Sequence, residues 1–119
     1  MSNEAKGPTP PETSVIARNK AVLGELPFAD RGDFADAERG FVATIPDATI
    51  LTAGGHPAWS QKQYAFIDDG PAPDSVNPSL WRIAQLNRRH GLFQVTEGVY
   101  QIRGLDIANM TIVEGKTGV

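Results

Sequence analysis

The stretch NPSLWRIAQLNRRHGLFQVTEGVYQIR, residues 77–103, decides the fold class of this chain of 119 residues. Asn77 can accept a hydrogen bond at a helix N-cap, and Pro78 suits the first helical position, where its missing N–H costs nothing. Gly91 is expected to end this helix. Residues 92–95 and 99–103 flank Thr96-Glu97-Gly98, which predicts a β-hairpin with glycine in its turn. A helix followed by a hairpin indicates an α+β fold.

Downstream of this stretch the sequence predicts one more strand, over residues 110–114, followed by a turn at Gly115-Lys116-Thr117-Gly118. A hairpin turn without a return strand leaves unpaired backbone groups on the last strand. We therefore expect an exposed sheet edge and a structural unit that is incomplete at its C-terminus.

Upstream of it the sequence predicts shorter elements. Residues 1–12 are polar and carry three prolines, so we expect a flexible lead. The further expected elements are helices over 13–26 and 34–39 and strands over 41–45 and 49–52, with a turn at Gly54-Gly55-His56-Pro57. The predicted division is a lead (1–12), a helical and hairpin extension (13–76), and a helix with the first strands of a truncated domain (77–119).

Composition excludes several classes of protein. The chain has no cysteine, which excludes a disulfide scaffold, a thiolate metal site and a cysteine nucleophile. A formal net charge of −3 without a basic run argues against nucleic acid or an anionic membrane as the main partner. No segment has the roughly 20 apolar residues of a membrane span, and the N-terminus does not resemble a secretory signal. We expect a soluble chain, cytoplasmic by default, although the sequence cannot choose a compartment.

Motifs that carry chemistry are missing. The two histidines, His56 and His90, are far apart and have no neighbouring ligands at metal-site spacing. The glycines around Lys116 lack the spacing of a phosphate-binding loop, and no Gly-x-Ser-x-Gly pattern occurs. Trp59 and Trp81 could stack on a ligand, but core packing is the commoner role. The residues alone therefore predict no catalytic residue and no metal ligand.

Several ordered stretches nevertheless carry a family resemblance. These are residues 77–87, 90–104 and 106–118, with Leu26-Pro27-Phe28-Ala29-Asp30 and residues 38–43 upstream. Together they resemble the opening of the zinc-dependent alkyl sulfatases, the SDS-hydrolase branch of the metallo-β-lactamase superfamily. The resemblance covers about residues 15–118, nearly the whole chain.

The resemblance implies an enzyme that hydrolyses sulfate esters of linear alkyl alcohols, such as dodecyl sulfate. It also implies two zinc ions in an αβ/βα sandwich, a dimerisation domain and a C-terminal sterol-carrier-like domain. Family members hold the metals with a His-x-His-x-Asp-His motif, which this sequence lacks. We therefore expect an N-terminal fragment that binds no cofactor by itself and is inactive alone. Related enzymes are often exported.

The resemblance places substrate contacts in and around the loop between the last two strands. Arg103 is the strongest candidate for binding sulfate, because a guanidinium matches an oxyanion bidentately, although a surface ion pair is the alternative. The other candidates have structural alternatives in sheet packing or in turn formation. The full set of candidates is Tyr100, Arg103, Asp106, Asn109 and Met110.

Two hypotheses of function follow. The first is an inactive hydrolase fragment whose intact relatives bind an alkyl sulfate and whose partner is the missing C-terminal portion. The alternative is a small non-catalytic module that forms a homodimer or pairs with a partner chain through exposed strand edges.

Overall fold

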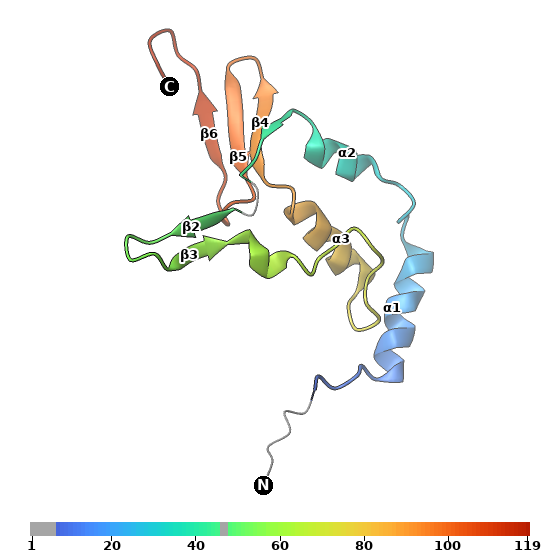
Figure 1. The fold of residues 1–119 in the computed structure, drawn as a ribbon. Helices are drawn as coiled ribbons and strands as arrows, with labels where there is room; N and C mark the ends of the chain where they lie inside the picture. The colour runs from blue at the N-terminus through green and yellow to red at the C-terminus, as the bar shows by residue number, and fades with distance from the viewer. Residues whose placement is uncertain (1–6, 46–47) are drawn as a thin grey trace.

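The computed structural model describes residues 7–45 and 48–119 (Figure 1). The chain contains both helices and strands, which confirms a mixed helix and sheet fold. The αβ/βα sandwich that the family resemblance implies stays a prediction. The elements are α1 (Thr13–Glu25), α2 (Gly32–Glu38), β1 (Phe41–Ala43), β2 (Thr49–Leu51), β3 (Pro57–Ser60), the 3-10 helix η1 (Gln61–Tyr64), α3 (Pro78–Asn87), β4 (Gly91–Thr96), β5 (Val99–Arg103) and β6 (Met110–Val113).

The larger sheet is antiparallel and has the strand order β1-β4-β5-β6. β4 and β5 form the predicted hairpin, in which Leu92 pairs with Ile102 and Phe93 with Gln101. Gly98 has a φ of 71° in its turn, a conformation that glycine adopts without strain. Among the described strands β6 has β5 as its sole neighbour, so the expected sheet edge is present.

The strands β1 and β2 are shorter than expected and do not pair with each other. β1 pairs with β4, so that Phe41 lies opposite Phe93, whereas β2 pairs with β3 in a separate two-stranded sheet. The predicted turn at Gly54-Gly55-His56-Pro57 joins β2 to β3, although Pro57 itself begins β3. The sequence analysis missed β3 because proline lacks a backbone donor, a defect tolerated at the first residue of a strand.

The start of α3 is as predicted, but its end is not. The Asn77 side-chain oxygen accepts a hydrogen bond from the Ser79 backbone N–H at 2.9 Å. The helix ends at Asn87, and Gly91 is the first residue of β4 rather than the helix terminator. Gly91 has a φ of 139°, and a Cβ there would lie 2.4 Å from the Ala43 carbonyl oxygen. Glycine at this position therefore serves the approach of β1 to β4.

The core is small. The buried apolar side chains are Phe34, Ala48, Ile67, Trp81 and Phe93. The helix α1, which the sequence predicts over residues 13–26, buries none of its residues. On α3 the buried side chains include Trp81 and Gln85, whereas Leu80 and Ile83 are 61% and 54% exposed. The described residues thus leave much of the apolar surface open to solvent.

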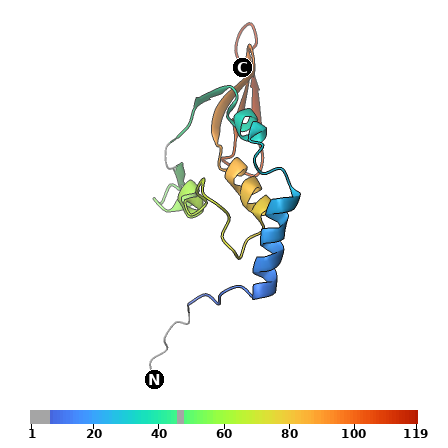
Figure 2. The same cartoon turned by 90° about the vertical axis from the view of Figure 1, so that its right-hand side faces the viewer.

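The arrangement of the elements is extended. α1 and α2 pack against α3, and the strands β4, β5 and β6 project away from α1 (Figures 1 and 2). Because β1 joins the sheet of β4–β6, the predicted parts 13–76 and 77–119 share one sheet. The division into those parts stays a prediction. Within the described ranges no helix is long and apolar enough to cross a membrane.

Candidate functional site

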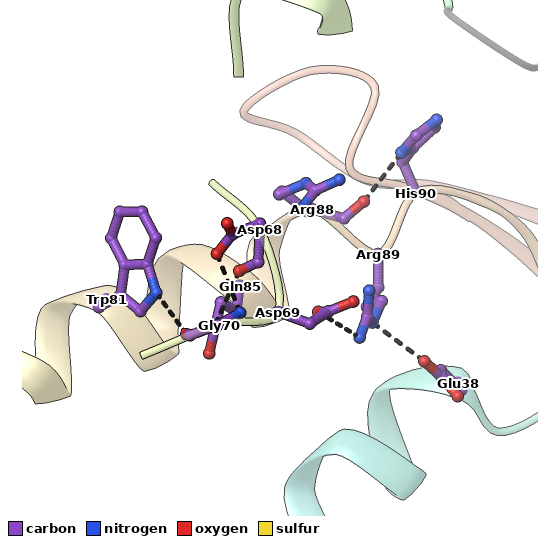
Figure 3. A network of polar contacts seen from close by, with 9 residues as sticks. All are labelled: Glu38, Asp68, Asp69, Gly70, Trp81, Gln85, Arg88, Arg89 and His90. Carbon is purple, nitrogen blue, oxygen red and sulfur yellow. Dashed lines mark hydrogen bonds and ion pairs between the residues drawn. The ribbon is translucent and has the colours of Figure 1, made fainter. Parts of the chain in front are cut away.

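Polar contacts hold the segment between α3 and β4 in place (Figure 3). Arg89 Nε lies 3.0 Å from Glu38 Oε1 on α2, and Arg89 Nη2 lies 3.2 Å from Asp69 Oδ1. His90 Nδ1 lies 2.9 Å from the Arg88 carbonyl oxygen. Both carboxylates are exposed, so these ion pairs contribute little energy and mainly fix geometry.

A second set of contacts ties the loop before α3 to that helix (Figure 3). Trp81 Nε1 donates to the Gly70 carbonyl oxygen at 3.0 Å. Gln85 Nε2 donates to the Asp68 and Gly70 carbonyl oxygens at 2.8 and 2.9 Å. These buried donors are satisfied by backbone acceptors, which is typical of a structural role. They tie residues 68–70 to α3.

A cavity of about 570 Å³ lies where three segments meet: β3 with η1, the end of α3, and the loop between β5 and β6. Gln61 Nε2 donates a hydrogen bond to the Gly104 carbonyl oxygen and thereby joins two of these walls. The lining residues are Trp59, Gln61, Tyr64, Ile67, Ala84, Asn87, Arg88, Gly104, Asp106, Ile107 and Asn109.

The cavity combines apolar walls with one cation, Arg88, and one carboxylate, Asp106. The rings of Trp59 and Tyr64 lie 6.1 Å apart, and the buried Trp59 Nε1 has no hydrogen-bond partner among the described residues. Arg88 is half-buried, and in the described part of the chain its side chain makes no hydrogen bond or ion pair. Such a lining suits a ligand that has an apolar body and an anionic group.

The structure brings together two of the five predicted substrate residues. Asp106 and Asn109 line the cavity, and Asp106 Oδ1 also accepts from the Ile107 backbone N–H at 2.7 Å. Tyr100 is half-buried within β5, and Met110 is 61% exposed at the start of β6. Neither of these two lines the cavity.

Arg103 also lies outside the cavity lining. Its guanidinium stacks on the Phe93 ring, with the Cζ atom 3.7 Å from the ring centroid. Its Nε is buried without a hydrogen-bond partner, and no ion pair to Arg103 occurs among the described residues. The guanidinium therefore covers the most buried aromatic side chain of the sheet, an interaction of cation–π type.

Comparisons with known proteins identify homologues of this chain. No family model matches the chain. The alkyl/aryl-sulfatase BDS1 of Saccharomyces cerevisiae is 48% identical over 108 residues, which are 91% of this chain and 17% of the yeast protein. An (R)-specific secondary-alkylsulfatase of Pseudomonas is 45% identical over 119 residues, 100% of this chain and 18% of the relative. This chain is homologous to the alkylsulfatases.

The fold agrees with this homology. The structure of the stereoselective inverting sec-alkylsulfatase Pisa1 from Pseudomonas matches with a TM-score of 0.86 at 49% identity. The match covers 92% of this chain and 17% of that chain. This chain therefore spans about 17% of the length of its alkylsulfatase relatives.

The described residues of this chain do not fit a zinc centre. They contain no group of three or more His, Cys, Asp or Glu side chains placed to hold a metal ion. His56 lies between β2 and β3, and His90 lies between α3 and β4, where its Nδ1 contacts a backbone carbonyl. No reaction step through a metal is therefore assigned to these residues.

Sequence analysis does not identify most of the residues that line the cavity of this chain. The sequence favours a core role for Trp59, and no sequence motif marks Tyr64 or Arg88 as a binding residue. The signal that could have found them is the aromatic pair on either side of Ser60, whose side chain accepts from the Lys62 backbone N–H and caps η1.

Proposed function

We propose that this chain is the N-terminal part of an alkylsulfatase that hydrolyses sulfate esters of linear alkyl alcohols, such as dodecyl sulfate. The observation that carries the proposal is similarity along nearly the whole chain to several alkylsulfatases. The linear primary-alkylsulfatase of Pseudomonas is 48% identical over 111 residues, 92% of this chain and 16% of that protein. The name of that enzyme supports a linear substrate.

The role proposed for the chain is scaffolding and substrate contact, without catalysis by the chain alone. The two zinc ions implied by the family resemblance would be held by residues elsewhere in an intact enzyme. This follows from the chemistry of the donor set, since the full sequence has two histidines and no cysteine. The described residues add no acidic cluster of suitable geometry.

The proposed substrate contacts are Tyr100, Arg103, Asp106, Asn109 and Met110. The position of Asp106 and Asn109 in the cavity supports two of them. We add Arg88 as a candidate for the anionic head group, because it lines the same cavity and has no ion pair in the described part of the chain. The aromatic and aliphatic walls would contact the alkyl chain.

A segment exchange tests this function. In the Pseudomonas linear primary-alkylsulfatase, the aligned segment is replaced by the corresponding residues of this chain. We expect sulfate release from dodecyl sulfate within about tenfold of the parent enzyme. A matched variant with the segment deleted serves as the control. A chimera that folds and binds its metals but releases no sulfate would contradict the proposal.

A second candidate function is a non-catalytic module, favoured by the free edge of β6. Unpaired backbone groups on such an edge can add a strand from another chain. Light scattering coupled to size exclusion separates the two candidates. A monodisperse species, monomer or dimer, that melts cooperatively would support the module, whereas aggregation or a non-cooperative melt would support the fragment.

A further inference from the structure

The strands β4, β5 and β6 present one apolar face. Leu92, Ile102 and Met110 lie directly opposite one another across the three strands. Tyr100 and Ile112 occupy the next row with Gln94. Side chains that are paired directly, or two residues apart in one strand, lie on the same face of a sheet. We call Leu92, Tyr100, Ile102, Met110 and Ile112 the apolar sheet face.

The two faces of this sheet are covered differently. On the opposite face Phe93 is 2% exposed, because Phe41 packs on it with ring centroids 5.6 Å apart and Arg103 stacks over it. On the apolar sheet face Met110 is 61% exposed and the other four side chains are half-buried, so none of the five is covered as Phe93 is. The described helices pack on one another rather than along these strands (Figures 1 and 2). An apolar sheet face requires a second layer.

The total exposed area is larger than that of a compact monomer. The chain exposes 9206 Å², whereas a folded monomer of 12.8 kDa exposes about 6,300 Å². If the residues outside the described ranges are given full exposure, at about 160 Å² each, an excess on the order of 1,500 Å² remains. One partner contributes about 800 Å² to a standard interface, so the excess over the whole chain, of which the apolar sheet face is one part, is large enough to include such an interface.

The shape leads to the same conclusion. The radius of gyration is 19.3 Å, against about 13.5 Å for a compact domain of this length. The principal extents are 64 × 45 × 18 Å. A plate of this thickness cannot bury many side chains by itself, in agreement with the small core.

The comparison with Pisa1 indicates what covers the face. The same fold, with a TM-score of 0.86, makes up 17% of that chain, so in Pisa1 it adjoins a much larger remainder of one polypeptide. We infer that the apolar sheet face docks against the remaining polypeptide of an alkylsulfatase. This inference rests on the proposed function and names the surface through which the segment joins the rest of the enzyme.

Association in trans tests the docking surface. The chain of 119 residues is co-expressed with the Pseudomonas linear primary-alkylsulfatase from which the aligned segment has been removed. We expect a complex with one copy of each part. Ile112→Asp should weaken the complex at least about tenfold, because it buries a charge in the interface. Thr111→Asp, one residue away and on the opposite face, should weaken it far less.

Amide hydrogen exchange provides a readout without any substitution. Exchange at residues 110–113 should slow at least about tenfold in the complex relative to the isolated chain, with no comparable change at the exposed outer turn of α1. Equal exchange in the free and bound states would overturn the inference.

The other outcomes are also decisive. Absence of a complex at micromolar concentration, equal weakening by Ile112→Asp and Thr111→Asp, or a homodimer that persists in the presence of the remainder would each overturn the docking surface. A complex that depends on Ile112 but releases no sulfate would support the surface and contradict the proposed function. An active segment exchange combined with an insensitive Ile112 would contradict the surface alone.

Discussion

Arg82 on α3 holds Asp33 on α2 with two hydrogen bonds: Nε donates to Oδ2 at 2.9 Å and Nη2 to Oδ1 at 2.6 Å. The same guanidinium donates to the Phe28 carbonyl oxygen at 3.1 Å and to the Asp30 carbonyl oxygen. One side chain thereby fixes α2 and the turn before it on α3. A bidentate guanidinium–carboxylate pair is both stronger and more directional than a single contact.

The first prediction concerns the acid response of this pair. The hydrogen bond from Arg82 holds the pKa of the Asp33 carboxyl below its ordinary value of 3.8. Because this pKa is lower in the folded chain than in the unfolded chain, the pair stabilises the fold at pH values above the ordinary pKa of the carboxyl. This contribution is lost as the pH falls through the lowered value. The titration of the Asp33 carboxyl carbon, followed by NMR, should shift upward in Arg82→Gln.

The control is Asp36→Asn on the same helix, whose side chain pairs with the exposed Arg39. It should leave the Asp33 titration unchanged, whereas Asp33→Asn should remove this part of the loss of stability in acid. An Asp33 titration that is identical in the presence and absence of Arg82 would show that the pair does not form.

The second prediction concerns Gly40, which follows α2. Gly40 has a φ of 73°, and a Cβ there would lie 2.1 Å from the Gln94 carbonyl oxygen. The Gln94 backbone N–H donates to the Gly40 carbonyl oxygen at 2.7 Å, so this contact joins the start of β1 to β4. Gly40→Ala should cost about 1–3 kcal/mol and accelerate amide exchange at Gln94.

Gly24→Ala is the matched control for this substitution. Gly24 lies in α1, and an added Cβ meets no atom within 4 Å. The substitution should stabilise the helix by about 0.5–1 kcal/mol and leave exchange at Gln94 unchanged. If both alanine variants change amide exchange at Gln94 equally, the claim that Gly40 closely approaches the Gln94 carbonyl oxygen is wrong.

The third prediction concerns Gln85, which is 5% exposed. Gln85→Met keeps the side-chain length but removes the donors to the Asp68 and Gly70 carbonyl oxygens. In the segment-exchange enzyme, amide exchange at residues 68–70 should accelerate by the equivalent of about 1–3 kcal/mol. Gln63→Met, at an exposed position of η1, should be nearly neutral. Equal exchange in the two variants would contradict the structural role of Gln85.

The parts of the fold that local sequence decides were predictable. The Asn77–Pro78 helix start, the hairpin around Gly98 and the end of α2 before Gly40 each depend on residues within a few positions. The pairing of β1 with β4 was not predictable in this way, since it joins residues far apart in sequence. β3 was missed because it begins at a proline.

The buried face of α3 illustrates a different limit. Apolar spacing alone does not show which side of a helix the tertiary fold covers. Leu80 and Ile83 form the more apolar side and are exposed, whereas Trp81 and Gln85 are buried through contacts with the Asp68–Gly70 loop. The inference that another part of an enzyme packs on this segment agrees with that pattern.

Of the residues that line the cavity, only those in the loop between β5 and β6 were predictable from the sequence. Asp106 and Asn109 were proposed from the loop that joins the last two strands, and both line the cavity. Trp59 and Arg88 reach the same cavity from separate elements, and only the tertiary fold brings them together. The role of the five proposed substrate residues stays a prediction.

The most direct test of the central claim is the zinc content and sulfatase activity of the purified chain of 119 residues. Zinc is measured by elemental analysis after incubation with the metal and removal of the excess. The account predicts no stoichiometric, tightly bound zinc and no sulfate release from dodecyl sulfate. One or two zinc ions retained per chain together with sustained release of sulfate would contradict it.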